Sequence, residues 1–218
     1  DSLTESGIYS DTLTGINGCD SIYSLNLTVW GTVVRNTLDT GFGSLRKAVF
    51  CACEGDTVSF DTSMIALGSS TILLSSQIEI TKSLVVKGLY SATDSVIISG
   101  TGTNRIFKVD LDTSTKKTIV FDSLILINGR ATNNDGAGIH LTNTEKFTLT
   151  NSVIRGNGVI RYFWLTNFNR GGGIYCIADT LILSNNKFHK NNAWEKSIGA
   201  GLYAKSKFVV IDDCIFSE

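Results

Sequence analysis

Aromatic side chains and arginine gather in two segments that join repeating parts of the chain. The binding candidates share a polar surrounding rich in Asn and Arg: Tyr162, Trp164, Phe168, Arg170 and Trp194. Rings beside such groups on an elongated surface are typical of proteins that bind carbohydrates or peptides. Alternatively, the rings fold back over the body of the protein as a small satellite core. The sequence leaves both interpretations open.

A second group of residues could support the cleavage of a polysaccharide. Asp110 and Asp112 lie close to Lys108 and Arg105, and a lyase needs clustered carboxylates for Ca²⁺ and a base that abstracts a proton. These residues flank a turn, VDLDTSTKK, and turns favour Asp for conformational reasons. We therefore interpret the group as a solvated loop and predict no catalytic residue, no cofactor and no metal.

The histidines and cysteines do not form a metal-binding pattern. His140 and His189 occupy different places in their repeats, so each is predicted to be a solvated outer-face residue. Cys51 and Cys53 are too close for the usual metal spacing. The five cysteines are an odd number, which predicts a partner outside the chain and leaves the disulfide pattern open. Cys214 is expected to be a small buried hydrophobic residue.

Composition narrows the class of protein. Charged residues make up 18% of the 218 residues, below the usual quarter, and the net charge is −1. The sequence therefore gives no electrostatic reason to expect nucleic acid or an anionic membrane as partner. It contains no apolar run of the ~18 residues that a membrane span needs. The absence of proline fits extended ladders in which nearly every N–H donates.

One unit recurs along the second half of the chain. Residues 171–191 form its clearest copy, and residues 136–157 and 199–216 are partial copies. The first glycines of the copies stand at 136, 171 and 199, which gives steps of 35 and 28. Polar pairs at the corners, Asn151-Ser152, Asn185-Asn186 and Asp212-Asp213, give steps of 34 and 27. Two landmarks thus indicate a long step followed by a short one, as in a solenoid with one variable loop.

Each copy alternates with the period of a strand. Leu181 and Leu183 share one side of the segment, as do Phe147 and Leu149 in the earlier copy and Val209 and Ile211 in the later one. Stacked coils would join these residues into aliphatic files, while Asn and Asp at the corners would form hydrogen-bonded ladders. The sequence therefore predicts an all-β fold, a right-handed parallel β-helix. Its joining loops, 129–135, 158–170 and 192–198, would lie along one edge.

Two smaller elements are expected before the repeats. Residues 7–14 and 21–29 alternate around a Gly-Ile-Asn-Gly turn, which predicts a β-hairpin. Further on, Ser44 is a plausible N-cap for a short helix whose residues Leu45, Ala48, Val49 and Ala52 share one face. Such a helix would cover the open end of the first coil. Residues 57–60 are expected to form the first strand.

The hairpin segment carries a distinctive motif, SGIYSDTLTGINGCDSIYSLNLTV. It resembles the end of an Ig-like repeat of large surface and gliding-associated proteins of the Bacteroidetes type. In that family the domain begins earlier, with its own cysteine, and this implies that the partner of Cys19 lies outside the chain. The resemblance also implies export through a type IX system.

The remainder resembles another group of proteins. A G-S-L-R-x-A helix, then G-D-T-V-x-F, then rungs of the G-G-G-I-Y and L-T-N-S-x-I kind occur here in that order. This is similar to the opening of the polymorphic outer-membrane and anchor-bearing parallel β-helix families. The resemblance covers roughly residues 33–218 and implies the fold more strongly than the function, since β-helices serve adhesins and lyases alike.

These observations lead to one expected organisation and two functions. Residues 1–30 would end an Ig-like repeat, residues 31–56 would form a linker and capping helix, and residues 57–218 a β-helix that is cut short. The expected function is that of a secreted or cell-surface bacterial protein for structure or adhesion, without catalysis, whose loops meet a surface glycan or a protein. The alternative is a polysaccharide lyase or hydrolase of the pectate-lyase-like fold.

Overall fold

The computed structural model describes residues 7–16, 18–27, 31–90, 93–111, 117–160, 168–194 and 197–218. The chain divides into two compact units, Asp1–Gly31 and Thr32–Glu218. Within the described ranges, no helix has the length and apolar character required to cross a membrane.

The first unit is the predicted hairpin. Strands β1 (Gly7–Thr14) and β2 (Asp20–Leu27) pair antiparallel, with Gly7 opposite Leu27 and Thr14 opposite Asp20. Gly18 has φ +75° and donates its N–H to the Gly15 carbonyl at 3.0 Å, which closes the turn. The turn chemistry of the sequence is therefore sufficient to set the register of this pair.

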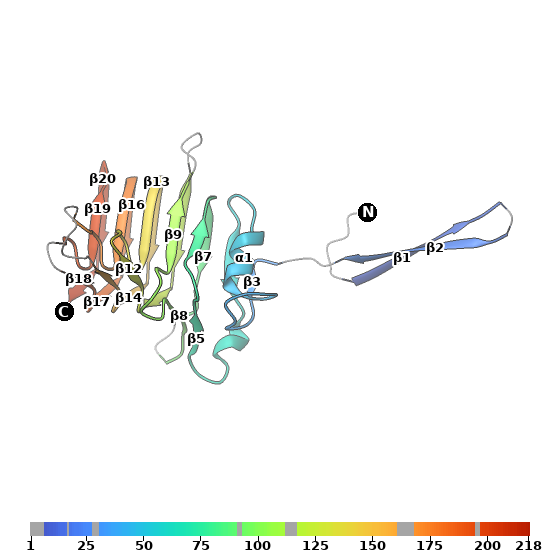
Figure 1. Ribbon diagram of the computed structural model, residues 1–218, viewed down its shortest axis with the longest axis horizontal. Coiled ribbons are helices and arrows are strands. Elements are labelled where there is room, and N and C mark those ends of the chain that lie inside the picture. The colour runs from blue at the N-terminus through green and yellow to red at the C-terminus, as the bar shows by residue number, and fades with distance from the viewer. Residues whose placement is uncertain are drawn as a thin grey trace. The chain divides into compact units, whose positions relative to one another are not determined.

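The second unit is a parallel β-helix (Figure 1). Each coil contributes a strand to up to four stacks, and neighbouring strands of every stack are parallel. The first stack holds β3 (Val33–Val34), β4 (Thr57–Phe60), β7 (Leu84–Lys87), β10 (Thr118–Asp122), the second halves of β13 (Ile139–Thr150) and β16 (Ile174–Ser184), and β20 (Phe208–Asp212). The second stack holds β6 (Ile78–Ile80), β9 (Phe107–Asp110), the first halves of β13 and β16, and β19 (Leu202–Lys205).

The other two stacks complete the cross-section of the coil. The third holds β5 (Ser70–Leu73), β8 (Val96–Ser99), β11 (Ile125–Ile127), β14 (Val153–Arg155), β17 (Lys187–His189) and β21 (Ile215–Ser217). Its six strands count six coils, which we number from the β5 coil to the β21 coil. The fourth stack is short and holds β12 (Arg130–Thr132), β15 (Gly158–Ile160) and β18 (Asn192–Ala193). A 3₁₀ helix (Thr62–Ile65) joins β4 to β5.

Inward-facing residues form the predicted files along the stack. Leu149, Leu183 and Ile211 occupy one register position on successive coils. Leu149 and Leu183 are fully buried, whereas Ile211 is 49% exposed because no coil of the described chain lies over it. The alternation read from the sequence therefore identifies the inward side of each strand, and the position of a coil in the stack determines how deeply that side is buried.

The corner residues correct one part of the predicted register. Ser123, Asn151, Asn185 and Asp213 are the equivalent residues, all in the left-handed region with φ between 45° and 56°. The predicted pair Asp212-Asp213 was wrong by one position, and the short corner step, from 185 to 213, equals the short glycine step. Asp resembles Asn in accepting a left-handed conformation, so composition alone did not distinguish Asp212 from Asp213.

A β-bulge accounts for the remaining difference between the long glycine step and the long corner step. Leu141 pairs with Cys176, and a little further along the same two strands Thr144 pairs with Ala178, so the offset between β13 and β16 shrinks by one. Asn143 lies in this irregularity with φ +55°. An extra residue in one strand bends it, and here the bend divides β13 between the first and second stacks.

Polar ladders join the coils at the corner, as the sequence predicted. Asn185 donates its side-chain amide to Asn151 Oδ1 at 2.9 Å, and Asn151 donates to Asp122 Oδ1 at 2.8 Å. One residue further along, the fully buried Asn186 donates to the Leu149 carbonyl at 2.8 Å. These bonds satisfy polar groups where the backbone turns away from the strand ladder.

The predicted capping helix is α1 (Leu45–Cys51), and Ser44 accepts the Lys47 N–H as its N-cap. Its face of Leu45, Ala48, Val49 and Ala52 is at most 3% exposed. Arg46 fastens the helix by donating to the Gln77 and Ser76 carbonyls at 2.8 and 2.7 Å. The helix therefore covers the first coil and bonds directly to the segment between its strands β5 and β6.

All five cysteines are free thiols. Cys214 is half-buried and packs against the core, consistent with its predicted apolar role. Burial raises the pKa of the Cys176 thiol to about 12, so this group is neutral and unreactive at physiological pH.

Candidate functional site

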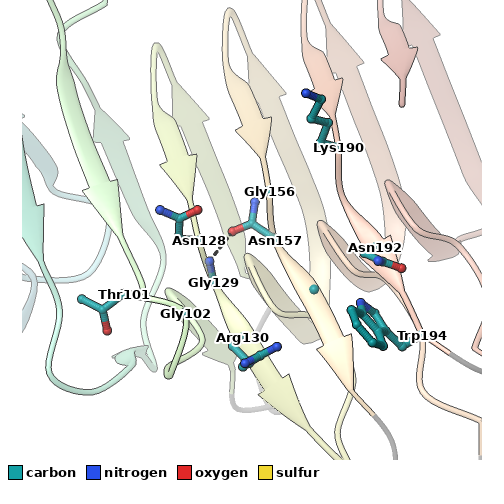
Figure 2. A pocket seen from close by; sticks show the side chains of 11 residues that line it. Thr101, Gly102, Asn128, Gly129, Arg130, Gly156, Asn157, Lys190, Asn192 and Trp194 are labelled. Carbon is teal, nitrogen blue, oxygen red and sulfur yellow. Dashed lines mark hydrogen bonds between the residues drawn. The ribbon is translucent and has the colours of Figure 1, made fainter.

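A polar groove runs over the corner where the third stack turns into the fourth. Its volume is ≈ 270 Å³. It is lined by Thr101, Gly102, Asn128, Gly129, Arg130, Gly156, Asn157, Gly158, Lys190, Asn192 and Trp194. Figure 2 shows these side chains on neighbouring strands of the stack. The groove therefore belongs to several coils rather than to a single loop.

Equivalent left-handed residues align the walls of the groove. Asn128, Gly156 and Lys190 follow β11, β14 and β17 and have φ of 52°, 63° and 49°. Each donates its N–H to a carbonyl on the next coil, at 3.0 Å for both Gly156 and Lys190. Because the same bend recurs at the same place, the residues that follow it point into the same space on each coil.

Glycines on the middle coil create the hollow. Gly158 pairs with Arg130 on one side and Asn192 on the other, and Gly156 lies between the corners of the same two coils. A side chain is thus missing at two outward positions of coil four, while coils three and five carry long polar side chains there. The groove is a notch between the side chains of coils three and five.

The floor of the groove is held by a buried asparagine. Asn157 is fully buried and accepts the Gly129 N–H at 2.7 Å. Its amide donates to the Leu126 carbonyl and to Asn191 Oδ1, both at 3.1 Å. With its acceptor and both donors engaged, Asn157 fixes the floor and leaves recognition to the residues of the walls.

Trp194 is the predicted site residue that the structure places in this groove. The backbone N–H of Trp194 donates to the Val159 carbonyl at 3.2 Å, and the residue is 52% exposed. Phe168 is 53% exposed and does not line the groove. Neither ring is buried as a satellite core would require. Tyr162 and Trp164 lie outside the residues that the structure describes.

Arg170 lies elsewhere, beside a column of stacked rings. His140, Tyr175 and Tyr203 are register neighbours, with ring centroids 5.0 and 5.4 Å apart, and the Arg170 guanidinium lies 5.2 Å from the Tyr203 ring. Of the predicted set, Trp194 and Arg170 therefore lie in different places, Trp194 in the groove and Arg170 beside the column of rings.

The column corrects the prediction of a solvated His140. Its Nδ1 atom is buried without a hydrogen-bond partner in the described chain. Burial lowers the pKa of His140 to about 4, and the charges of Arg105 and Lys108 contribute to this lowering, so the ring is neutral at physiological pH. His189 remains on the outer face, with its Nδ1 atom 2.9 Å from Ser217 Oγ.

The charged group considered for catalysis does not behave as one site. Arg105 is only 8% exposed and donates to the Gly136 and Asp135 carbonyls, both at 2.7 Å, so its prediction as part of a solvated loop was wrong. Asp110 accepts from the Asn143 amide at 3.0 Å and thereby supports the bulge. Asp112 lies outside the described residues. Among those described, no three His, Cys, Asp or Glu residues are grouped so as to hold a metal.

The predicted loops are also corrected in part. Segments 129–135, 158–170 and 192–198 were expected to be loops, yet each begins with a strand of the fourth stack, β12, β15 or β18. A small apolar cluster of Ala131, Val159 and Ala137 lies behind these strands. Such short strands carry too little alternation to be recognised in a polar segment.

Sequence reasoning missed Arg130, Lys190 and the two glycines of the notch. Once the coils are aligned at their left-handed corners, Asn128, Gly156 and Lys190 are equivalent, and so are Arg130, Gly158 and Asn192. That alignment was the available signal. Comparisons with protein-family models, curated proteins and solved structures gave no match for this chain.

Proposed function

We propose that this protein is an extracellular or cell-surface β-helix that serves adhesion or structure and binds glycans in the groove around Trp194. The observation that carries the proposal is a half-exposed indole at the rim of a polar notch. A flat ring stacks on the apolar face of a sugar, while Asn and Arg side chains bond to its hydroxyl groups.

The residues of the groove support binding rather than cleavage as the activity. Coils that hydrogen-bond to one another form a stiff scaffold on which outward residues keep fixed positions. None of the described residues that line the groove is Asp or Glu, which a lyase or hydrolase would use for Ca²⁺ binding or for acid and base steps. The resemblance to Bacteroidetes-type surface repeats and to outer-membrane β-helix families supports a location outside the cell and export by a type IX system.

Glycan binding by the whole chain tests the proposal. A glycan array followed by calorimetry on a bound oligosaccharide should give a Kd that rises at least tenfold in Trp194→Ala, which corresponds to about 1.4 kcal/mol. Trp194→Phe should retain much of the affinity because it keeps an aromatic face.

Phe168→Ala is the matched control, since Phe168 is equally exposed but lies outside the groove lining. Its Kd should equal that of the wild type. Binding that survives Trp194→Ala and disappears in Phe168→Ala would place the site elsewhere, and the release of shortened glycan products would refute a purely binding role.

A further inference from the structure

We infer that the groove selects anionic glycans, carboxylated or sulfated, that lie along the stack across coils three to five. This inference rests on the proposed function and adds the chemical class of the ligand. The Arg130 and Lys190 side chains on the two walls of the notch would contact the acidic groups, and Trp194 would contact a ring.

The distribution of charge supports this class of ligand. On coils three to five, the face formed by residues 123–134, 151–160 and 185–194 carries four cations and no Asp or Glu: Arg130, Arg155, Lys187 and Lys190. The whole chain has 19 Lys and Arg against 20 Asp and Glu, so the rest has 15 against 20. A local charge of +4 thus lies on a chain whose remainder carries −5.

None of these four cations forms an ion pair with a carboxylate of the described residues. The pairs found there are Arg35 with Asp61, Arg46 with Asp39, Lys117 with Glu54 and Lys207 with Asp179. Among the described residues, acidic residues return on this face at the flanking coils, as Asp94, Asp213 and Glu218; Glu195, which follows Trp194 in the sequence, lies outside the described residues. The unpaired positive region therefore coincides with the three coils whose residues build the notch.

One carboxylate just beyond this face, that of Asp135, is already engaged elsewhere. Asp135 follows β12, and its side chain accepts the backbone N–H of Arg170 at 2.6 Å. The charges of Arg170 and Arg105 also act on it. Its partners are therefore on the adjoining side of the coil, which leaves Arg130 to the groove.

The spacing fits a polymer that runs along the stack. Arg130 precedes the notch by one coil and Lys190 follows it by one, so the two cations are about 10 Å apart along the axis at roughly 4.8 Å per coil. One coil is close to the length of one pyranose unit, so acidic groups on alternate sugars would reach both walls. Gly156 and Gly158 between them leave room for the sugar backbone.

A nucleic acid is the competing polyanion, and the lining favours a glycan. Among the described residues the groove offers one aromatic ring, that of Trp194, whereas proteins that bind single strands stack successive bases on several rings. Asn128 and Asn192 are exposed in the walls and can bond to sugar hydroxyls.

Three polymers with one backbone provide the test: dextran, carboxymethyl-dextran and dextran sulfate of equal length. At an ionic strength of about 0.01 M, where the Debye length is about 30 Å, both charged forms should bind the whole chain at least tenfold more tightly than dextran. The variant Arg130→Ala with Lys190→Ala should remove this difference. The control variant Arg155→Ala with Lys187→Ala removes two charges that do not line the groove. It should keep more than half of the difference in binding free energy between the charged dextrans and dextran. Comparison of carboxymethyl-dextran with dextran sulfate then shows whether the groove prefers carboxylate or sulfate groups.

A variant that fills the notch tests the position of the ligand without loss of a charge. A Cβ on Gly158 would lie 3.6 Å from the Asn192 carbonyl oxygen, an ordinary contact, and Gly158 does not have a positive φ. Gly158→Thr should therefore fold as the wild type does and lose at least tenfold in affinity for dextran sulfate.

Equal affinity for all three dextrans, with glycan binding still dependent on Trp194, would overturn the inference and leave the proposed function standing. Wild-type affinity in both Gly158→Thr and the Arg130 and Lys190 variant would overturn it as well. So would tighter binding of a thymidine oligonucleotide than of dextran sulfate. An absence of glycan binding under all conditions would refute the proposed function together with the inference.

Discussion

Polar side chains serve two different purposes at the same corner of the coil. Asn157 points inward, is fully buried and uses its acceptor and both donors on Gly129, Leu126 and Asn191. Arg130 and Lys190, which line the groove above it, are exposed and make no ion pair within the described chain. One set of polar groups is used up by the fold, and the other remains available to a ligand.

This contrast between buried and exposed polar residues indicates where a binding surface lies in a solenoid. Residues of one type recur at both kinds of position, since Asn157 lies under the groove and Asn192 lies in its wall. What separates them is burial and the number of bonds already made. An asparagine whose capacity is filled contributes to stability, whereas an exposed one can be exchanged with little effect on folding.

The largest expected effect separates these two asparagines directly. Asn157→Ala leaves the buried Gly129 N–H without a partner and removes the side-chain bonds to the Leu126 carbonyl and Asn191, so we expect a loss of about 2–3 kcal/mol in the free energy of unfolding. Asn192→Ala removes an exposed side chain and should change stability by less than about 0.5 kcal/mol. Urea unfolding followed by circular dichroism measures both.

Equal losses of unfolding free energy in the two variants would contradict this distinction, because burial would then not decide the role of the asparagine. If Asn157→Ala were as stable as the wild type, a water molecule would have to replace its three bonds. In either case the groove floor could not be treated as a rigid support.

Much of the fold could be predicted from the sequence because its signals are local and repeated. Leu149 lies between Thr148 and Thr150, and Ser44 begins a helix with one apolar face, so strand, cap and core followed from period and capping rules. The register at Asp213 was missed by one residue, because Asp212 and Asp213 fit a left-handed corner equally well by type.

The site could be predicted only in part. Trp194 was identified from its chemistry, but Arg130 and Lys190 are distant in the sequence and become neighbours of one notch only through the alignment of the coils. The notch itself is made by absent side chains at Gly156 and Gly158. A sequence pattern identifies residues by the chemistry of their side chains, so it gives little indication of glycines that act by lacking one.

The next largest effect concerns His140, which lies on the outer side of its strand although its Nδ1 atom is buried. His140 has a pKa of about 4 in the folded protein against 6.5 in the unfolded chain, because burial disfavours its charged form. Between these values the unfolded chain binds the proton and the folded protein does not. The stabilising contribution of a neutral His140 is therefore complete above pH 6.5 and declines as the pH falls toward 4.

His140→Phe tests this contribution because it keeps a ring against Tyr175 and removes the titrating group. The urea midpoint of the wild type should fall more steeply between pH 6.5 and 4 than that of the variant, because the variant lacks the imidazole that takes up a proton on unfolding. Parallel curves would mean that His140 is solvated and belongs with the groove residues in the comparison.

The smallest expected effect is the one on which the binding experiments depend. Arg130→Ala with Lys190→Ala should change the free energy of unfolding by less than about 0.5 kcal/mol, since both side chains are exposed and unpaired and their removal relieves repulsion between like charges. Urea unfolding at low and high salt measures it, and the wild type should gain slightly more from salt than the variant does. A loss above about 1 kcal/mol would show that the walls of the groove help to hold the coils together. The weaker binding of that variant would then report a damaged fold, and Gly158→Thr would remain as the variant that tests the position of the ligand.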